Sequence, residues 1–449
     1  MKKIFQYIML AVVTIAMASC TSDIEETTAT TGKNNVQLVV GEFPAFGDSQ
    51  TRAIGTPDEG KTSWAVGDEL LLEIDNTSYG RHNATFTYNG KSWELTSGEL
   101  IYLEGDPAYI SHVYYAPNYK WSNTSLMLKK GKVAGTDELI EGKARITGNG
   151  ETITVSFAEA TRKYSRLRIA TLPNEQITVD TEYFTPAGSS DMEQKGNYAL
   201  TSDEKGNAYL YGTFENNSEV TVKYREAALT TYTFSQATES AKSYALDATV
   251  ISANSAEEIK SAIEQKVADG KTTIRLNLAP NAGTNEFMAI REAIKGAAPN
   301  DLGTIELTII GVETIPEEAF YKMLQLKSVR MSDVKEIKKY AFKECQYLTV
   351  VEAPSLNKLY SGAFKKCDQL SKLTFGPINY ADARNWPIFE YITPNIDLIL
   401  SDYQKEMIET DSYLYTANND RDYAGSDEHN SKNFLGREFK SITCRYPVE

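Results

Sequence analysis

The C-terminal third of this 449-residue chain contains a 22-residue repeat, which limits the folds open to it. A fixed period of this length is typical of folds in which each repeat buries its apolar face only against its neighbours. We therefore expect a stacked array with one short strand per repeat. Six columns of like residues recur in three segments: Ile315, Ile337 and Leu359; Ala319, Ala341 and Ala363; Phe320, Phe342 and Phe364; Met323, Cys345 and Cys367; Leu326, Leu348 and Leu370; Val329, Val351 and Leu373.

These columns fit the pattern I…AF..C..L..V, which resembles the BspA-like leucine-rich repeats of bacterial surface antigens. The resemblance implies an α/β leucine-rich-repeat solenoid, which we place at residues 251–375. The pattern stops at Gly376-Pro377, so we expect residues 376–449 to form a C-terminal cap.

A looser 31-residue repeat precedes the regular one. Its return segments are long enough for helices, and Ser255 is the expected N-cap of the first, with Glu258 at the capping-box position. Asp269-Gly270 is expected to end that helix. The repeat relates Ile259, Ala262, Ile263, Ile274, Leu276 and Leu278 to Ile290, Ala293, Ile294, Ile305, Leu307 and Ile309.

The strands of this array are expected to form a parallel sheet with a charged outward face. Opposite charges adjacent across strands would stabilise the sheet by tenths of a kcal/mol per pair. Alternatively, the face binds a host or bacterial surface protein or glycan, since repeat arrays present extended concave surfaces. The expected central row is Arg275, Glu306, Arg330, Glu352 and Thr374, and the flanking residues are Thr308, Ser328, Val350 and Lys372.

Residues 36–250 have the pattern of β-structure, with short β-branched and aromatic runs between turn signals. Helical periodicity is not sustained there, so two mainly antiparallel β-sandwiches are predicted, at 36–150 and 151–250. Asn89-Gly90 predicts a hairpin with a type I′ turn, because both central residues of that turn need positive φ. The strand candidates are residues 36–40, 69–74, 85–88, 93–95 and 208–212.

This half resembles the fimbrillin family of pilins and pilus-associated lipoproteins. The matching residues are Thr51-Arg52-Ala53, the segment WAVGDEL at 64–70 and, more weakly, YSRLRI at 164–169. The resemblance implies transthyretin-like sandwiches and a mode of assembly. Cleavage after Arg52 would remove the first strand, and the vacated groove would accept a strand from another pilin. Alternatively, Arg52 is an exposed loop arginine.

The N-terminus has the order of a lipoprotein signal peptide. Lysines precede an apolar stretch that is too short to span a bilayer, and Met17-Ala18-Ser19-Cys20 matches a lipobox. Residues 1–20 are therefore the expected signal peptide, Cys20 the expected acylation (palmitate) site, and residues 21–35 a disordered tether. Acidic residues after Cys20 resemble export signals. They favour a surface-exposed position on the cell outer membrane, or in a fimbrium.

Charge and composition disfavour several other classes of protein. The net charge of −15 argues against a nucleic-acid partner. Cys345, Cys367 and Cys444 lack metal-site spacing, and the first two fall in an apolar column. No phosphate-binding or catalytic motif occurs, so we expect no metal, no cofactor and no enzymatic activity.

The expected function is cell-surface adhesion, as a fimbrial tip or pilus-associated subunit that presents the repeat domain. The alternative is a surface glycan-binding lipoprotein accessory to nutrient uptake. That alternative depends on exposed aromatic residues such as Trp121, with Tyr114, Tyr115 and Tyr119.

Overall fold

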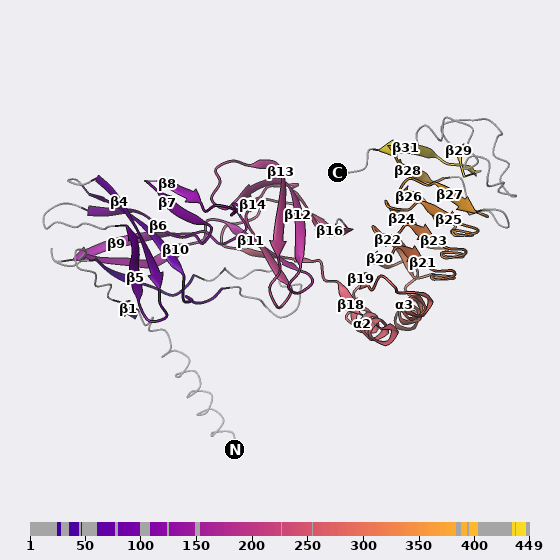
Figure 1. Cartoon of the computed structure of the whole chain (residues 1–449), viewed down its shortest axis with the longest axis horizontal. Helices are drawn as coiled ribbons and strands as arrows, with labels where there is room; N and C mark the ends of the chain where they lie inside the picture. The colour runs from indigo at the N-terminus through magenta and orange to yellow at the C-terminus, as the bar shows by residue number, and fades with distance from the viewer. Residues whose placement is uncertain are drawn as a thin grey trace, which may run out of the picture. The chain divides into compact units, whose positions relative to one another are not determined.

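The computed structural model divides into two units, whose helices and strands are labelled in Figure 1. Unit 1 comprises Met1–Ala170, Val179–Val220 and Tyr232–Asp247, and unit 2 comprises Thr171–Thr178, Thr221–Thr231 and Ala248–Glu449. Among the described residues, no helix has the length and apolar character needed to cross a bilayer. The structure describes residues 25–27, 36–44, 46, 61–76, 80–98, 108–123, 125–148, 153–225, 227–253, 255–382, 388–392, 395–402, 433–435 and 437–445.

The described chain is mostly β-structure, with two helices and several sheets. Its first sheet has the order β1-β2-β10-β9-β6-β3-β4-β5, and β2 is parallel to β10 while the other pairs are antiparallel. A separate hairpin pairs β7 with β8. The strands are β1 (Glu25–Thr27), β2 (Val36–Val40), β3 (Glu69–Asn76), β4 (Gly80–Tyr88), β5 (Trp93–Gly98), β6 (Ala108–Tyr115), β7 (Tyr119–Ser122), β8 (Ser125–Leu128), β9 (Ile140–Gly148) and β10 (Ile153–Thr161).

The hairpin predicted at Asn89-Gly90 is present, but its loop is longer than predicted. Tyr88 pairs with Trp93, which leaves four residues in the loop. The Asn89 side chain accepts hydrogen bonds from the Lys91 and Ser92 amides, both at 2.8 Å. Gly90 has a φ of 96°, and Asn89 is not among the residues with positive φ. An Asn side chain that binds its own turn favours this wider loop over the two-residue type I′ turn.

The second sheet has the order β16-β15-β12-β14-β11-β17, with β13 paired to β12. Its inner side includes a row of phenylalanines in which Phe214 stacks on Phe184 at 4.4 Å and on Phe234 at 4.8 Å. The strands are β11 (Ser165–Ala170), β12 (Gln176–Pro186), β13 (Glu193–Thr201), β14 (Asn207–Phe214), β15 (Glu219–Tyr224), β16 (Ala227–Thr233) and β17 (Ser243–Asp247).

Unit 2 is built on a parallel ladder with the order β18-β19-β20-β22-β24-β26-β28-β31. A second parallel ladder has the order β21-β23-β25-β27. The strands are β18 (Ile251–Ala253), β19 (Thr273–Leu278), β20 (Ile305–Ile310), β21 (Thr314–Ile315), β22 (Leu326–Arg330), β23 (Glu336–Ile337), β24 (Val350–Ala353), β25 (Lys358–Tyr360), β26 (Lys372–Phe375), β27 (Tyr380–Asp382), β28 (Asp397–Ser401), β29 (Asn433–Phe434), β30 (Arg437–Glu438) and β31 (Ser441–Arg445).

The six repeat columns form the core of unit 2, as predicted. Every member is at least 95% buried. Phe342 stacks on Phe320 at 5.1 Å and on Phe364 at 5.4 Å, and Phe364 stacks on Phe389 at 5.7 Å, so the stack extends one step beyond the sequence repeat. The return segments are also joined by backbone bonds such as Phe320 N to Ala341 O at 2.8 Å. Successive repeats therefore stabilise one another through side chains and backbone together.

Two helices precede the regular repeats. The Ser255 side chain accepts from the Glu258 amide at the start of α2 (Ala256–Ala268), as predicted, and Gly270 follows the helix with a φ of 73°. At the start of α3 (Thr284–Ala297) the Gly283 amide donates to the Glu286 carboxylate at 2.8 Å. At the other end, β28 and β31 continue the main ladder beyond Phe375, where the 22-residue pattern stops.

Candidate functional site

The nine residues predicted for a partner-binding face lie in two adjacent rows on the main ladder of unit 2. We call these two rows the repeat face. The first row runs Thr273, Glu306, Ser328, Val350, Lys372, Asp397 and Ser441, and the second runs Arg275, Thr308, Arg330, Glu352, Thr374, Ile399 and Thr443.

The predicted central row is wrong at one strand. Glu306 was expected beside Arg275 and Arg330, but the ladder places Thr308 there and puts Glu306 in the other row. The 31-residue repeat aligned Ile274 with Ile305, whereas Ile274 pairs with Leu307. A slip of two residues leaves the same side chains pointing inward, so the apolar pattern does not distinguish the two registers.

Ion pairs cross the exposed part of the repeat face. Arg330 Nε lies 2.9 Å from Glu352 Oε2, as expected for neighbouring opposite charges. Glu306 instead pairs with Lys327, at 2.8 Å. These side chains are between 30% and 51% exposed, so each pair stabilises the sheet by at most about 1 kcal/mol. Partly solvated charges of this kind remain accessible to a partner.

Two predicted residues, Arg275 and Thr308, are not accessible on the repeat face. They are only 5% and 4% exposed. Arg275 Nε donates to the Leu229 carbonyl on β16 at 2.6 Å, so this guanidinium is held by backbone of its own unit. The expectation that Arg275 is an outward-facing member of the row is therefore wrong. The cause is a contact with residues far away in sequence.

A pocket of about 220 Å³ opens at this end of the repeat face. The Arg330 guanidinium is 46% exposed, and it can donate with the Thr273 and Ser328 hydroxyls to a carboxylate or to sugar hydroxyls. Sequence reasoning missed Thr230, Thr231 and Thr273, because no local pattern marks a residue that lines a pocket from a distant strand. The lining residues are Leu229, Thr230, Thr231, Thr273, Arg275, Glu306, Leu307, Thr308, Ser328 and Arg330.

Residues 302–410 match the BspA type leucine rich repeat region, in six copies. The predicted BspA-like repeat is thereby confirmed from residue 302 to residue 375, which includes β20, β22, β24 and β26 of the repeat face. The match continues to residue 410, within the segment that was expected to form the cap. A search of the curated proteins finds no match to the chain.

Among solved structures, the chain is similar to one from Bacteroides fragilis that is described provisionally as a cell adhesion protein. The sequences are 11% identical, the match covers 51% of this chain and 93% of that chain, and the TM-score is 0.32. At these values the similarity carries no argument about this chain.

The thiols of the leucine-rich-repeat core are structural. Cys345 and Cys367 are fully buried, and each Sγ donates to a carbonyl of the preceding repeat, Phe320 O and Phe342 O, at 3.0 Å. Burial raises the pKa of Cys345 to about 12 and that of Cys367 well above its usual value. No cluster of metal-ligating side chains occurs in the described part of the chain. Cysteines in this state act as small apolar residues.

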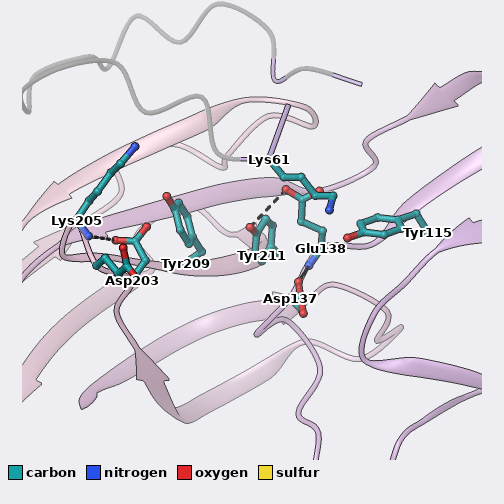
Figure 2. A pocket seen from close by; sticks show the side chains of 9 residues that line it. Lys61, Tyr115, Asp137, Glu138, Asp203, Lys205, Tyr209 and Tyr211 are labelled. Carbon is teal, nitrogen blue, oxygen red and sulfur yellow. Dashed lines mark hydrogen bonds between the residues drawn. The ribbon is translucent and has the colours of Figure 1, made fainter. Parts of the chain in front are cut away.

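Unit 1 contains a cavity of about 450 Å³ lined by tyrosines and carboxylates (Figure 2). Tyr211 points at Glu138, with the two oxygens 3.5 Å apart. Burial raises the pKa of Asp137 and of Glu138. The lining is Lys61, Tyr115, Asp137, Glu138, Asp203, Glu204, Lys205, Tyr209 and Tyr211. A cavity with this lining suits a cationic or strongly hydroxylated group.

The aromatic residues suggested for glycan stacking serve mainly as packing. Tyr115 and Tyr119 are 4% and 6% exposed, and the Tyr119 hydroxyl donates to the Ala187 carbonyl at 2.9 Å. Trp121 packs against Tyr114 with ring centroids 6.1 Å apart. The remaining predicted sites, Cys20 and Arg52, lie outside the described residues.

Proposed function

We propose that this chain is a cell-surface adhesion protein, a fimbrial tip or pilus-associated subunit that presents the repeat face to a protein or glycan on a host or bacterial surface. The observation that carries the proposal is the repeat face itself. From Glu306 and Arg330 onward it presents mainly charged and hydroxyl side chains, with Val350 and Ile399 among them, over a parallel ladder backed by a buried core. Such a surface suits binding without catalysis, and the proposal includes no enzymatic activity and no cofactor.

The proposal includes a finer architecture. Residues 36–150 and 151–250 form two fimbrillin-like, transthyretin-like β-sandwiches, and residues 251–375 form a solenoid that residues 376–449 cap, with β28 and β31 as the last strands of its main ladder. The separate sheets of β1 to β10 and of β11 to β17, followed by the two parallel ladders, are consistent with it. Export by a signal peptide and acylation at Cys20 would place the chain on the outer membrane, which accords with a role in contacting other surfaces.

Assembly by strand addition is the proposed link to a pilus. β2 pairs with β1 on one side and with β10 on the other, and both β1 and β2 precede Arg52. Cleavage after Arg52 followed by release of this segment would leave the β10 edge unpaired, and an unpaired edge accepts a strand from another chain. Incubation of the folded protein with an arginine-specific protease tests the first step, because failure to shorten the chain at Arg52 would remove this mode of assembly.

Two experiments test the adhesion proposal. An antibody to the leucine-rich-repeat region should recover a polymer, with this chain in it, from the cell surface. Arg330→Glu and Lys372→Glu should weaken adhesion of cells that carry the chain to host-cell or bacterial monolayers. Lys358→Glu, an exposed lysine on the second ladder, is the matched control and should leave adhesion unchanged. Recovery of single chains only, with equal adhesion of all three variants, would contradict the proposal.

The 220 Å³ pocket favours a second candidate function, that of a surface glycan-binding lipoprotein accessory to nutrient uptake. Hydroxyl and guanidinium groups in a pocket of this size suit one sugar residue of a polysaccharide. A glycan array with the purified ectodomain tests it directly. Ser328→Val, in the pocket, should reduce binding, and Thr374→Val, in the same face but outside the pocket, should not.

A further inference from the structure

An ion pair in unit 1 is buried although both of its partners are charged. Arg162 Nη1 lies 3.0 Å from Glu138 Oε2, and the two side chains are 4% and 5% exposed. Arg162 lies between β10 and β11, and Glu138 lies just before β9. Burial lowers the pKa of Arg162 and raises that of Glu138, so desolvation disfavours the charged form of each. Such a pair persists only when further hydrogen bonds satisfy its polar atoms.

Those further hydrogen bonds come from the N-terminal segment. Arg162 Nε and Nη2 both donate to the Pro44 carbonyl, at 3.0 and 2.9 Å. Pro44 is 118 residues earlier in the chain and follows β2 by four residues. The segment is fixed nearby at a second point, where Trp64 Nε1 donates to the Gly41 carbonyl at 2.9 Å.

The same segment supplies an aromatic ring to two arginines. The Arg162 Cζ is 3.7 Å from the Phe46 ring centroid, and the Arg166 Cζ is 4.3 Å from it. Arg166 is 2% exposed, its Nε donates to Ser243 Oγ at 2.9 Å, and its Cζ is 5.3 Å from the Tyr209 ring centroid. Glu138 therefore orients the Arg162 guanidinium and Ser243 orients the Arg166 guanidinium, so that both can contact one aromatic ring. Contact between a desolvated guanidinium and a ring is worth more than the same contact in water.

We propose that Arg162, Arg166 and Glu138 form a recognition site for an extended segment with a backbone carbonyl and, two residues later, an aromatic side chain. Residues 36–46 occupy this site in the intact chain. This proposal rests on the strand-addition step of the proposed function. A strand from another chain that replaces residues 36–46 would need the same carbonyl and aromatic side chain. A cut at Arg52 leaves every one of these contacts in place. The segment, with any lipid on it, therefore stays bound until a segment of matching chemistry displaces it.

The test uses the chain with the recognition sequence of a site-specific protease in place of residues 47–52, cut to completion. The measured quantity is the rate at which the labelled N-terminal fragment leaves. In the parent chain we expect the cut fragment to dissociate only slowly. The dissociation rate should rise roughly tenfold with Phe46→Leu or Arg166→Lys and should equal the parent rate with Phe46→Tyr. Phe234→Leu makes the same substitution at a more deeply buried ring of unit 1 outside the site, and it should not change the rate.

Competition provides a second measurement. A peptide with the sequence of residues 36–46 should displace the labelled fragment, and the same peptide with Ala in place of the last Phe should not. Departure of the original fragment directly on cutting, equal rates for Phe46→Leu and the parent, or equal displacement by both peptides would overturn the proposal. None of these results depends on natural cleavage at Arg52. Failure here is therefore distinguishable from failure of the proposed adhesion function.

Discussion

Arg162 and Glu138, 24 residues apart in sequence, form an ion pair of 3.0 Å that is almost completely withdrawn from solvent. Tyr211 approaches the second Glu138 oxygen at 3.5 Å, and the Pro44 carbonyl accepts two hydrogen bonds from Arg162. The pair thus joins the N-terminal segment, the loop before β9, the loop after β10 and β14. A buried pair with this many partners contributes more to holding these segments in one arrangement than to net stability.

Removal of one partner of this pair should destabilise unit 1 strongly. Arg162→Met leaves the Glu138 carboxylate buried without its cation, which typically costs about 3–5 kcal/mol. The double variant with Glu138→Leu removes both charges and should recover most of that loss. Denaturant unfolding of the two variants and the parent measures the effect, and a loss below about 1 kcal/mol in the single variant would show that the pair is not buried in solution.

The phenylalanine stack should dominate the stability of the leucine-rich-repeat region. Phe342 is fully buried between Phe320 and Phe364, so Phe342→Ala should lower the free energy of unfolding by about 3–5 kcal/mol. Phe342→Leu keeps most of the volume and should cost less. Because each repeat is stabilised by its neighbours, hydrogen exchange should increase in both flanking repeats as well. An increase in hydrogen exchange that is confined to the repeat containing Phe342 would contradict a continuous core.

Alkaline pH should destabilise unit 2 through its buried thiols. The pKa of Cys345 is about 12 in the folded chain against 9.0 for a free thiol, so the folded state holds its proton more strongly than the unfolded state. The resulting stabilisation is present in full below pH 9 and is lost as the pH rises towards 12. The slope from one such group is about 1.4 kcal/mol per pH unit. Cys345→Ala and Cys345→Val should both reduce the slope of unfolding free energy against pH in this window, and an unchanged slope would contradict the shift.

A backbone position in the repeat turns should tolerate glycine. Glu318, Tyr340 and Gly362 are 22 residues apart and have φ values of 56°, 58° and 60°. A residue with a Cβ is disfavoured in this left-handed region by roughly 1 kcal/mol, so Glu318→Gly should raise the melting temperature slightly. Glu317 is adjacent and is not among the residues with positive φ. Glu317→Gly should therefore lower the melting temperature, and the same sign for both variants would refute the argument.

The repeat core could be predicted in detail because its signal is purely local. A column such as Phe320, Phe342 and Phe364 recurs at one spacing, and stacked repeats turn equal spacing into direct contact. The helix start at Ser255 was predictable for a similar reason, since a cap depends on residues within one turn. The hairpin at Asn89 was located correctly, but its loop length was not, because the Asn side chain competes for the turn amides.

The charged face was only partly predictable. Alternation with a period of two predicts which side chains point outward. A shift of two residues in the register between neighbouring strands preserves that alternation, so the sequence does not reveal it. The displacement of Glu306 from the central row is the result. The burial of Arg275 depends on the Leu229 carbonyl, 46 residues earlier, which no local pattern indicates.

The repeat period, the residues of each core column and the alternation of the strands can be predicted from the chain alone, since they depend on neighbours a fixed distance away along it. The register of the ladder, the burial of Arg275 and the docking of Pro44 and Phe46 onto Arg162 arise only when distant segments pack together. Contacts of this second kind join residues from 33 to 118 positions apart, and their energies depend on desolvation. Desolvation is a property of the packed molecule, and no stretch of sequence specifies it alone.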